Sequence, residues 1–355
     1  MKQVFLFHAG KIQHYRIGVY NYLHNFLKKH GYFLTIISEG LPSNLNLTIN
    51  FPEIELLFSF RMLAKLVRCQ RPWANILFIN HREKYFYPFL LYLRLRGNKA
   101  ITWTHGINFQ KKSDRLSRIA HHLEHALCHR IILYSEEIKK YLLPGHRQKA
   151  FAANNTLNLT DYIPDKKIKE QVLNRYNIFT KKNIAYSGSF DERKRLLDLM
   201  NAFENICDEE TGLILIGNGK DKTISERIKN NRQIFYLGPL YGKEVLDVLT
   251  ASDVCCIPGA VGLGIVDSMY CGLPLVTENV DQGPEIMYFK EGVNGFMVPK
   301  GDIIALSEKL RLLIKNDELR ERMSQNARNE ILTNGHIDNL CNGFLRCLRS
   351  LENKD

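Results

Sequence analysis

Short apolar runs alternate with longer amphipathic segments along the first part of the chain. Strands that alternate with helices in this way are typical of βαβ units and a parallel sheet. The pattern therefore predicts one doubly wound α/β domain. Its expected strands lie at 4–7, 33–37, 76–79, 100–104 and 130–134, and its expected helices include 15–29, 58–68, 87–96 and 115–127.

The same alternation restarts after a polar, lysine-rich stretch at 161–182, which we interpret as a connection. We thus expect an α/β protein with two Rossmann-like domains facing across a cleft, at 1–165 and 166–336, and a C-terminal helix within 337–355 that could pack back on the first domain. The expected elements of the second domain are strands 183–187, 213–216, 234–237, 254–257 and 274–277, and helical segments 195–206, 264–271 and 303–332.

Length and composition are those of a globular protein. The 355 residues suit two domains of about 150 residues each, and hydrophobic residues make up 45% of the chain. No apolar stretch approaches the ~20 residues needed to span a bilayer, and the N-terminal apolar run is too short for a signal peptide. The eight cysteines show no CxxC spacing, so we expect reduced thiols in a cytoplasmic protein.

Positive charge is concentrated in the first domain. Residues 1–160 hold 23 Lys and Arg against 8 Asp and Glu, a net charge of +15, whereas the remainder holds 26 against 29, or −3. This asymmetry points to an anionic partner such as a membrane surface, a phosphorylated lipid or a nucleic acid, although a solubilising surface explains it equally well.

Three glycine-containing turns follow expected strands of the second domain. The first ends a strand near Gly188 and places Arg193, Lys194 and Arg195 where a helix begins. Cations at a helix N-terminus oppose the helix dipole, which favours contact with phosphate over solvated charge. The second turn, 217–220, is a weak signal by itself.

The third turn, at 258–274, combines a glycine-spaced loop with the start of a helix. Backbone amides at 262–264 could hold a diphosphate or sugar hydroxyls, and Asp267 could accept hydrogen bonds from a ribose. On local evidence, an ordinary helix-start carboxylate explains Asp267 equally well.

In their order and spacing, residues 183–300 resemble the donor domain of glycosyltransferase family 4, the retaining GT-B enzymes that build bacterial polysaccharides and glycolipids. The family's G-R-x4-K turn aligns with 188–194, and its E-G-F-G-L-x3-E-A-M-A-x-G-x-P signature aligns with 259–274. Its glycine turn, its "flG" strand end and its later "gg-x-p-E" and "nG-f-v-p" segments align with 217–219, 236–238, 281–285 and 294–299.

Two departures from the family pattern concern groups that touch the donor. The first glutamate of the family's pair is Gly259 here, and the second is shortened to Asp267. The arginine that usually accompanies the lysine at the diphosphate is Ser189. Glu285 is a candidate substitute at the sugar, and an inactive relative is an alternative.

The first domain resembles the family more faintly. Thr104-His-Gly106 looks like the turn whose histidine approaches the donor sugar, 133–135 resembles the family's "vSe" strand end, and 154–161 occupies the place of the hinge segment. Histidines 121, 122, 125 and 129 recur at helical spacing without a recognised ligand motif, so we interpret them as a polar or partly buried helix face and expect no metal site.

The resemblance implies transfer of a hexose or related sugar, with retention, from a nucleotide-diphosphate sugar, most plausibly a UDP- or GDP-sugar, and without a metal or other cofactor. It assigns catalysis to His105, Arg193 and Lys194, and substrate binding to Gly188, Ser189, Gly217, Gly238, Gly262, Leu263, Gly264, Asp267 and Glu285.

The implied acceptor is a lipid-linked glycan in capsule, O-antigen or exopolysaccharide synthesis at the inner face of the cell membrane. The aromatic segment 85–95 suits a membrane interface or a plain core helix equally. A GT-B sugar-nucleotide epimerase is the enzymatic alternative, and a nucleic-acid-binding protein is disfavoured because no such motif is present. Candidate membrane or acceptor contacts are Arg61, Lys65, Arg68, Arg94, Arg96, Lys111 and Lys112.

Overall fold

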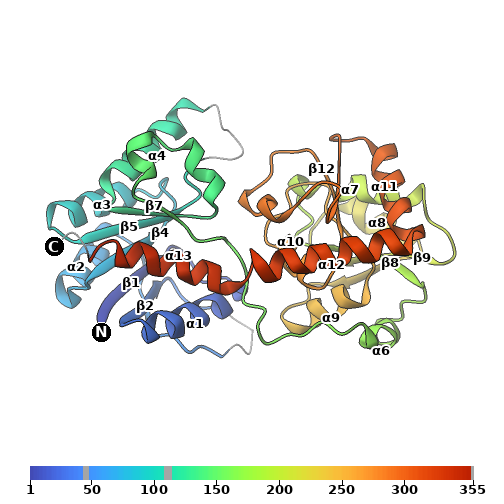
Figure 1. Ribbon diagram of the computed structural model, residues 1–355, viewed down its shortest axis with the longest axis horizontal. Coiled ribbons are helices and arrows are strands. Elements are labelled where there is room, and N and C mark those ends of the chain that lie inside the picture. Colours follow the sequence, from blue (N-terminus) through green and yellow to red (C-terminus); the bar gives the residue numbers. More distant parts are fainter. Residues whose placement is uncertain (43–47, 108–113, 353–355) are drawn as a thin grey trace. The chain divides into compact units, whose positions relative to one another are not determined.

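The chain forms two compact domains, each built on a parallel sheet. The computed structural model describes residues 1–42, 48–107 and 114–352. Domain 1 consists of Met1–Asn158 and His336–Asp355, and domain 2 of Leu159–Gly335 (Figure 1). The α/β fold class predicted from the alternating pattern is confirmed.

Domain 1 contains a seven-stranded parallel sheet with strand order β3-β2-β1-β4-β5-β6-β7. The order reverses between β1 and β4, which is the topological switch point of a doubly wound sheet. All five predicted strands are present, whereas β3 and β7 were missed because each is only three residues long. The strands are β1 (Lys2–His8), β2 (Tyr32–Ser38), β3 (Glu53–Glu55), β4 (Ala74–Phe78), β5 (Lys99–Thr104), β6 (Arg130–Leu133) and β7 (Ala150–Ala152).

Helices cover both faces of this sheet, so its strands are buried on two sides. Along β1, Val4 and Leu6 belong to one hydrophobic core, while Phe5 and Phe7 belong to the other, as the two-residue period of a strand requires. The helices are α1 (His14–Lys29), α2 (Phe60–Gln70), α3 (Phe86–Leu95), α4 (Arg115–Leu127), α5 (Pro144–Arg147) and α13 (Ile337–Arg349), with a 3₁₀ turn η1 (Glu136–Tyr141).

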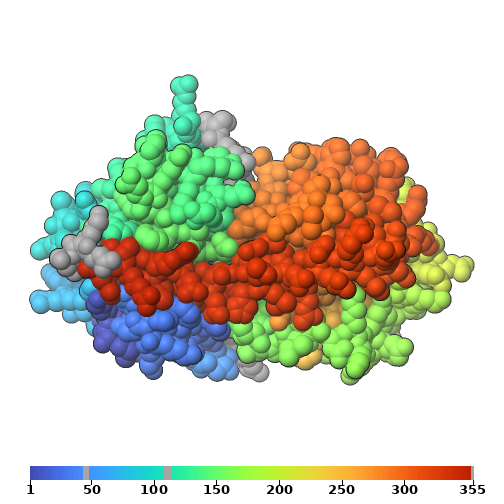
Figure 2. All heavy atoms as spheres, in the orientation of Figure 1, coloured from blue at the N-terminus to red at the C-terminus, as the bar shows by residue number. Residues whose placement is uncertain are grey.

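The C-terminal helix α13 packs on domain 1, as the sequence allowed. The Phe344 ring meets the Trp103 ring edge to face at 5.0 Å. A Cβ atom at Gly343 would lie 2.3 Å from the Ala152 carbonyl oxygen, so only glycine lets the helix come this close to β7. In Figure 2, α13 is the dark-red band between the blue and green parts of domain 1.

Domain 2 contains a six-stranded parallel sheet with strand order β10-β9-β8-β11-β12-β13. Its switch point lies between β8 and β11. The predicted strands are all present, and β13 was missed within the loop-like segment before the last helices. The strands are β8 (Lys182–Ser187), β9 (Thr211–Ile216), β10 (Ile234–Gly238), β11 (Val254–Cys256), β12 (Leu275–Glu278) and β13 (Gly295–Val298).

The single helical region expected at 303–332 is two helices, because Asn316 has an extended backbone and its side chain caps the second helix by accepting from the Leu319 amide. No helix in the described ranges is long and apolar enough to cross a membrane. The helices of domain 2 are α6 (Lys169–Arg175), α7 (Leu196–Glu204), α8 (Lys222–Asn230), α9 (Lys243–Ala251), α10 (Gly264–Tyr270), α11 (Ile303–Lys315) and α12 (Asp317–Thr333), with 3₁₀ turns η2 (Lys166–Ile168), η3 (Glu192–Lys194) and η4 (Pro284–Tyr288).

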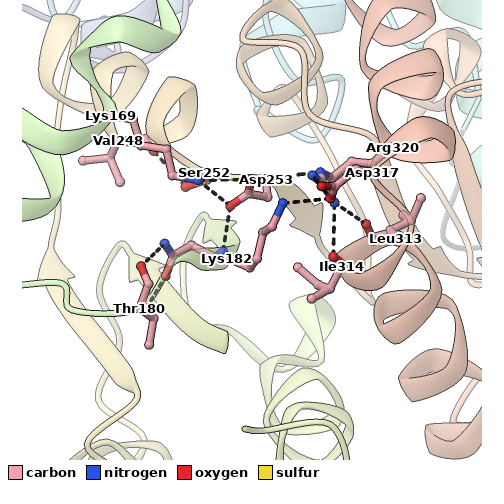
Figure 3. Close-up of polar contacts among 11 residues, drawn as sticks. Lys169, Thr180, Lys182, Val248, Ser252, Asp253, Leu313, Ile314, Asp317 and Arg320 are labelled. Carbon is pink, nitrogen blue, oxygen red and sulfur yellow. Dashed lines mark hydrogen bonds and ion pairs between the residues drawn. The ribbon is translucent and has the colours of Figure 1, made fainter. Parts of the chain in front are cut away.

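A buried carboxylate joins elements at the amino end of this sheet (Figure 3). Asp253, which precedes β11, accepts hydrogen bonds from the Asn183 amide at 2.8 Å and from Lys169 Nζ at 2.9 Å. Beside it, Arg320 donates to the Leu313 and Ile314 carbonyl oxygens at the end of α11. These bonds satisfy backbone groups that the sheet and α11 leave open.

Replacing Asp253 with alanine should lower the stability of domain 2 by about 3 kcal/mol, because an amide and a partly buried ammonium lose their partner together. Hydrogen exchange of β8 and β11 is the suitable measurement, since both tryptophans, Trp73 and Trp103, lie in domain 1. Glu244→Ala, which removes an exposed partner of Arg175, is the control and should cost less than ~1 kcal/mol. If the amides of β8 and β11 were equally protected from hydrogen exchange in the two variants, the stabilising role of Asp253 would be contradicted.

Candidate functional site

Two of the predicted turns flank the switch point of domain 2. One follows β8 and spans 188–195, and the other follows β11 and spans 257–263. Ligands of open parallel sheets bind at the carboxyl ends of the strands on either side of a switch point. The topology therefore brings these two turns together at the place where a ligand is expected.

Backbone hydrogen bonds join the two turns directly. The Gly259 amide donates to the Lys194 carbonyl oxygen at 3.1 Å, and the Ala260 amide donates to the Arg193 carbonyl oxygen at 3.1 Å. In return, Lys194 Nζ donates to the Ala260 carbonyl oxygen and, at 3.1 Å, to that of Val261. Lys194 is thus fixed between the turns, and burial, assisted by Arg193, lowers its pKa against the opposing effects of Asp191 and Glu285.

This backbone contact explains the departure at Gly259. A Cβ atom at this position would lie 1.9 Å from the Arg193 carbonyl oxygen, which is far inside van der Waals contact. Any side chain here would force the two turns apart. The glutamate that the family carries at this position is therefore excluded by the local backbone of this chain.

Three consecutive amides beside Lys194 are open. The amides of Gly262, Leu263 and Gly264 have no hydrogen-bond partner among the described residues, whereas the amides at 259–261 and at 265–266 are all bonded within the chain. A Cβ atom at Gly262 would lie 3.7 Å from Lys194 Nζ, so this end of the open run is close to the ammonium group. Adjacent amides and a cation are the donor set that binds phosphate oxygens.

Gln282 supports the loop that carries these amides. Its Oε1 accepts from the Val261 amide at 2.9 Å, and its Nε2 donates to the Gly259 carbonyl oxygen at 3.2 Å. The side chain is buried, so it holds the loop from behind. Sequence reasoning missed this residue, although it lies within the segment 281–285 that resembles the family.

The other two cations of the first turn have different surroundings. Arg195 is paired with Glu278 of β12, whose carboxylate is fully buried, at 2.7 Å, so its role is structural. Arg193 is 69% exposed and pairs with Asp191 at 3.3 Å. Because exposed ion pairs are weak, Arg193 can exchange this partner for a ligand at little cost.

Three predicted site glycines serve the packing of one turn on another. The Gly188 amide donates to the Ile216 carbonyl oxygen, and the Gly217 amide donates to that of Gly238. A Cβ atom at Gly217 would lie 1.8 Å from the Gly188 carbonyl oxygen, so close backbone approach accounts for this glycine. Ser189, which replaces the family's arginine, donates to Asp191 at 2.6 Å and so orients the partner of Arg193.

Two carboxyl groups complete the candidate site of domain 2. Asp267 lies on α10, and its carboxyl group has no hydrogen-bond partner in the part of the chain that the structure describes; burial raises its pKa to about 7. Glu285 lies in η4, is buried and acts electrostatically on Lys194. Asp267 is partly buried, and a carboxyl group with a raised pKa beside a phosphate-binding turn is a candidate ligand group.

His105 lies in domain 1, just after β5. It is exposed, and its ring centroid is 4.3 Å from that of Tyr134. Its predicted role at the donor sugar stays a prediction. Lys111 and Lys112, which we had proposed as acceptor contacts, lie outside the described residues.

Domain 1 has a polar cluster at its own switch point, which sequence reasoning missed. His8, the last residue of β1, has Nδ1 2.6 Å from the Tyr20 hydroxyl oxygen. Arg16, in the first turn of α1, is buried over Trp103 and donates to Asn155 Oδ1 at 3.1 Å. Arg16 follows a strand and a glycine turn, and this position in the sequence is the signal that could have identified it.

Comparison with known proteins shows which family domain 2 resembles. Residues 165–330 match the family model of glycosyl transferases group 1. Domain 2 is therefore similar to the group 1 glycosyltransferases over nearly its whole length. This similarity agrees with the sequence-based prediction of a glycosyltransferase.

The chain is also similar to two curated enzymes. Phosphatidyl-myo-inositol mannosyltransferase from Mycobacterium leprae is 28% identical over 149 residues, 40% of this chain and 39% of that protein, so the match spans about two fifths of its length. N-acetyl-alpha-D-glucosaminyl L-malate synthase from Bacillus anthracis is 22% identical over 348 residues, with 86% of each chain covered.

Solved structures share the two-domain fold. Anabaena HepE in complex with UDP superimposes with a TM-score of 0.80 at 15% identity, covering 99% of this chain and 100% of that one. A glycosyltransferase from Rickettsia africae gives a TM-score of 0.78 at 16% identity over the full length of both chains. The chain thus has the two-domain GT-B fold.

Replacing Asp267 with asparagine should make domain 2 more resistant to heat, and more so at about pH 8 than at about pH 5. Between the pKa of an unfolded aspartate, near 4, and the folded value of about 7, folding takes up a proton, so rising pH destabilises the native state. Asparagine removes this cost. Thermal unfolding followed by circular dichroism, with the exposed Asp281→Asn as control, measures the effect; an equal gain at both pH values would contradict it.

Proposed function

We propose that the protein is a retaining glycosyltransferase of family 4 that transfers a hexose or related sugar from a nucleotide-diphosphate sugar to a glycan acceptor. The observation that carries this proposal is the run of open amides at 262–264 beside Lys194 Nζ. It supplies donors for a diphosphate at the switch point of a group 1 glycosyltransferase domain.

Departure of the nucleoside diphosphate is the demanding step, because negative charge develops on the leaving oxygen. Donors that are already fixed in place stabilise this charge without reorganising. Lys194 is fixed by two carbonyl oxygens that a phosphate oxygen can replace. We assign Arg193, once released from Asp191, to the same diphosphate.

The remaining assignments concern the two ends of the donor. Asp267, a carboxyl group with no partner among the described residues, accepts hydrogen bonds from the ribose. Glu285, which acts on Lys194, takes the place of the glutamate that cannot fit at Gly259. His105 approaches the transferred sugar from domain 1. The complex of HepE with UDP supports a UDP-sugar, and the mannosyltransferase relative supports a mannosyl donor as the second choice.

The test is calorimetric binding of UDP, GDP, dTDP and ADP sugars, followed by transfer assays with the donor that binds. Lys194→Ala should reduce the transfer rate by about 100-fold or more, because one fixed donor to the leaving group is lost. Lys229→Ala, which removes an exposed lysine of α8, is the control and should leave both binding and rate unchanged.

Other outcomes separate the alternatives. Failure of every sugar nucleotide to bind would indicate an inactive scaffold, and conversion of a sugar nucleotide without acceptor would indicate an epimerase. The anomeric configuration of the product, read by NMR, tests retention. An inverted product would remove the family 4 assignment while leaving the transferase intact.

We further propose that the acceptor is lipid-linked and that domain 1 binds the cytoplasmic face of the membrane in surface polysaccharide synthesis. The neighbouring helices α2, α3 and α4 expose apolar and basic side chains together, which suits an anionic lipid surface. The buried positions of α3 show that this helix also serves as a core helix. The exposed apolar residues are Phe60, Met62, Leu91, Leu95, Leu116, Ile119 and Leu123, and the exposed basic ones are Arg61, Lys65, Arg68, Arg94, Arg96, Arg115 and Arg118.

Vesicle co-sedimentation tests this surface. Replacing Lys65, Arg94 and Arg96 with alanine should weaken binding to anionic vesicles by roughly 100-fold, at about 1 kcal/mol for each charge. Removing three exposed charges of domain 2, at Lys222, Lys229 and Arg232, is the control and should change binding little. Undiminished binding by the first triple variant would contradict the proposed surface.

A further inference from the structure

Histidines from three segments gather in domain 1. His121, His122 and His125 lie on α4, His81 follows β4, and His146 belongs to α5. The His81 and His121 ring centroids are 4.5 Å apart, and the His121 and His125 rings are stacked at 6.0 Å. The sequence predicted a polar or partly buried helix face at these positions, and the contact with His81 was not visible in the sequence.

A buried carboxylate lies within this cluster. Glu124, three residues after His121 on the same helix, is 2% exposed. The Thr102 hydroxyl of β5 donates to Glu124 Oε1, which fixes the carboxylate. The other oxygen, Oε2, lies 3.2 Å from His121 Nδ1. One ligand atom each of His81, His121 and Glu124 can be chosen so that all three lie within 4.8 Å of one another.

Another buried atom of the cluster lacks a partner. Nε2 of His125, a residue that is 2% exposed, has no hydrogen bond within the described ranges. Buried polar atoms without partners are rare, and an unseen water or ion is a common reason for one. This nitrogen is not one of the three ligand atoms that lie within 4.8 Å of one another, but it shows that a second polar group one helical turn after His121 is unsatisfied.

We propose that His81, His121 and Glu124 bind a divalent transition-metal ion, with Zn²⁺ the best fit. Two imidazoles and a carboxylate, with water in a fourth position, form a recognised zinc ligand set. Metal–ligand bonds of about 2.0–2.2 Å place the ligand atoms of a tetrahedral site roughly 3.4 Å apart, so the pair formed by His121 and Glu124 already has a suitable separation.

His81 is the ligand that moves to complete the site. It is only partly buried and lies in the connection between β4 and α3. An ion held by His81 and α4 ties this connection to the helix, at the carboxyl side of β5. The site lies entirely within domain 1, so it stands independently of the sugar-nucleotide site of domain 2.

The experiment is a competitive Zn²⁺ titration of the full chain after removal of metal with a chelator. We expect one high-affinity ion per chain. His81→Ala should weaken binding by at least about 100-fold, since even outer-shell groups contribute 10- to 100-fold. Because His81 is partly exposed, this variant should keep its fold, which circular dichroism checks. His122→Ala is the matched control from the same helix and should bind as the wild type does.

Two results would overturn the proposal. One is equal Zn²⁺ affinity in His81→Ala and His122→Ala. The other is a Co²⁺ spectrum with thiolate charge-transfer bands, which would place the ion on cysteines; all eight cysteines of the chain are free thiols. Tetrahedral Co²⁺ bands without thiolate transitions, lost in Glu124→Gln, would support it.

Discussion

The backbone hydrogen bonds from the loop after β11 to the turn after β8 determine the rest of the candidate site. They position the Lys194 ammonium and use the amides at 259 and 260; because Gln282 bonds the amide at 261, the open donors begin at 262. They also exclude any side chain at Gly259. A single contact between two main-chain segments thus accounts for both a retained cation and a missing carboxylate.

The three adjacent cations of the first turn illustrate how position determines role. Arg195 is the residue with positive φ, and its side chain neutralises a buried glutamate of β12. Arg193 points to solvent and forms an ion pair with Asp191. Only Lys194, between them, is directed at the opposite loop. Local spacing of like charges therefore says little about which charge meets a ligand, and the direction of each side chain decides it.

The sequence predicted the parts of the fold that have strong periodicity. Long apolar strands and the longer amphipathic helices were found, whereas the short helices α6, α8 and α9 were missed. Strands β3, β7 and β13 have three or four residues and too little pattern to be recognised. The break at Asn316 depends on one side-chain cap. Gln282, the pairing of Arg195 with Glu278 and the meeting of His81 with α4 depend on contacts between distant segments, which hydrophobic periodicity does not encode.

The discontinuity of domain 1 has a consequence for synthesis on the ribosome. Its core contains Phe344 and Leu348 of α13 as well as residues of β1, so the core of domain 1 is incomplete until α13 has been made. Domain 2 is continuous from Leu159 to Gly335 and has all of its residues earlier. N-terminal domains usually fold first during synthesis, but here domain 2 has all of its residues before the core of domain 1 can be completed by α13.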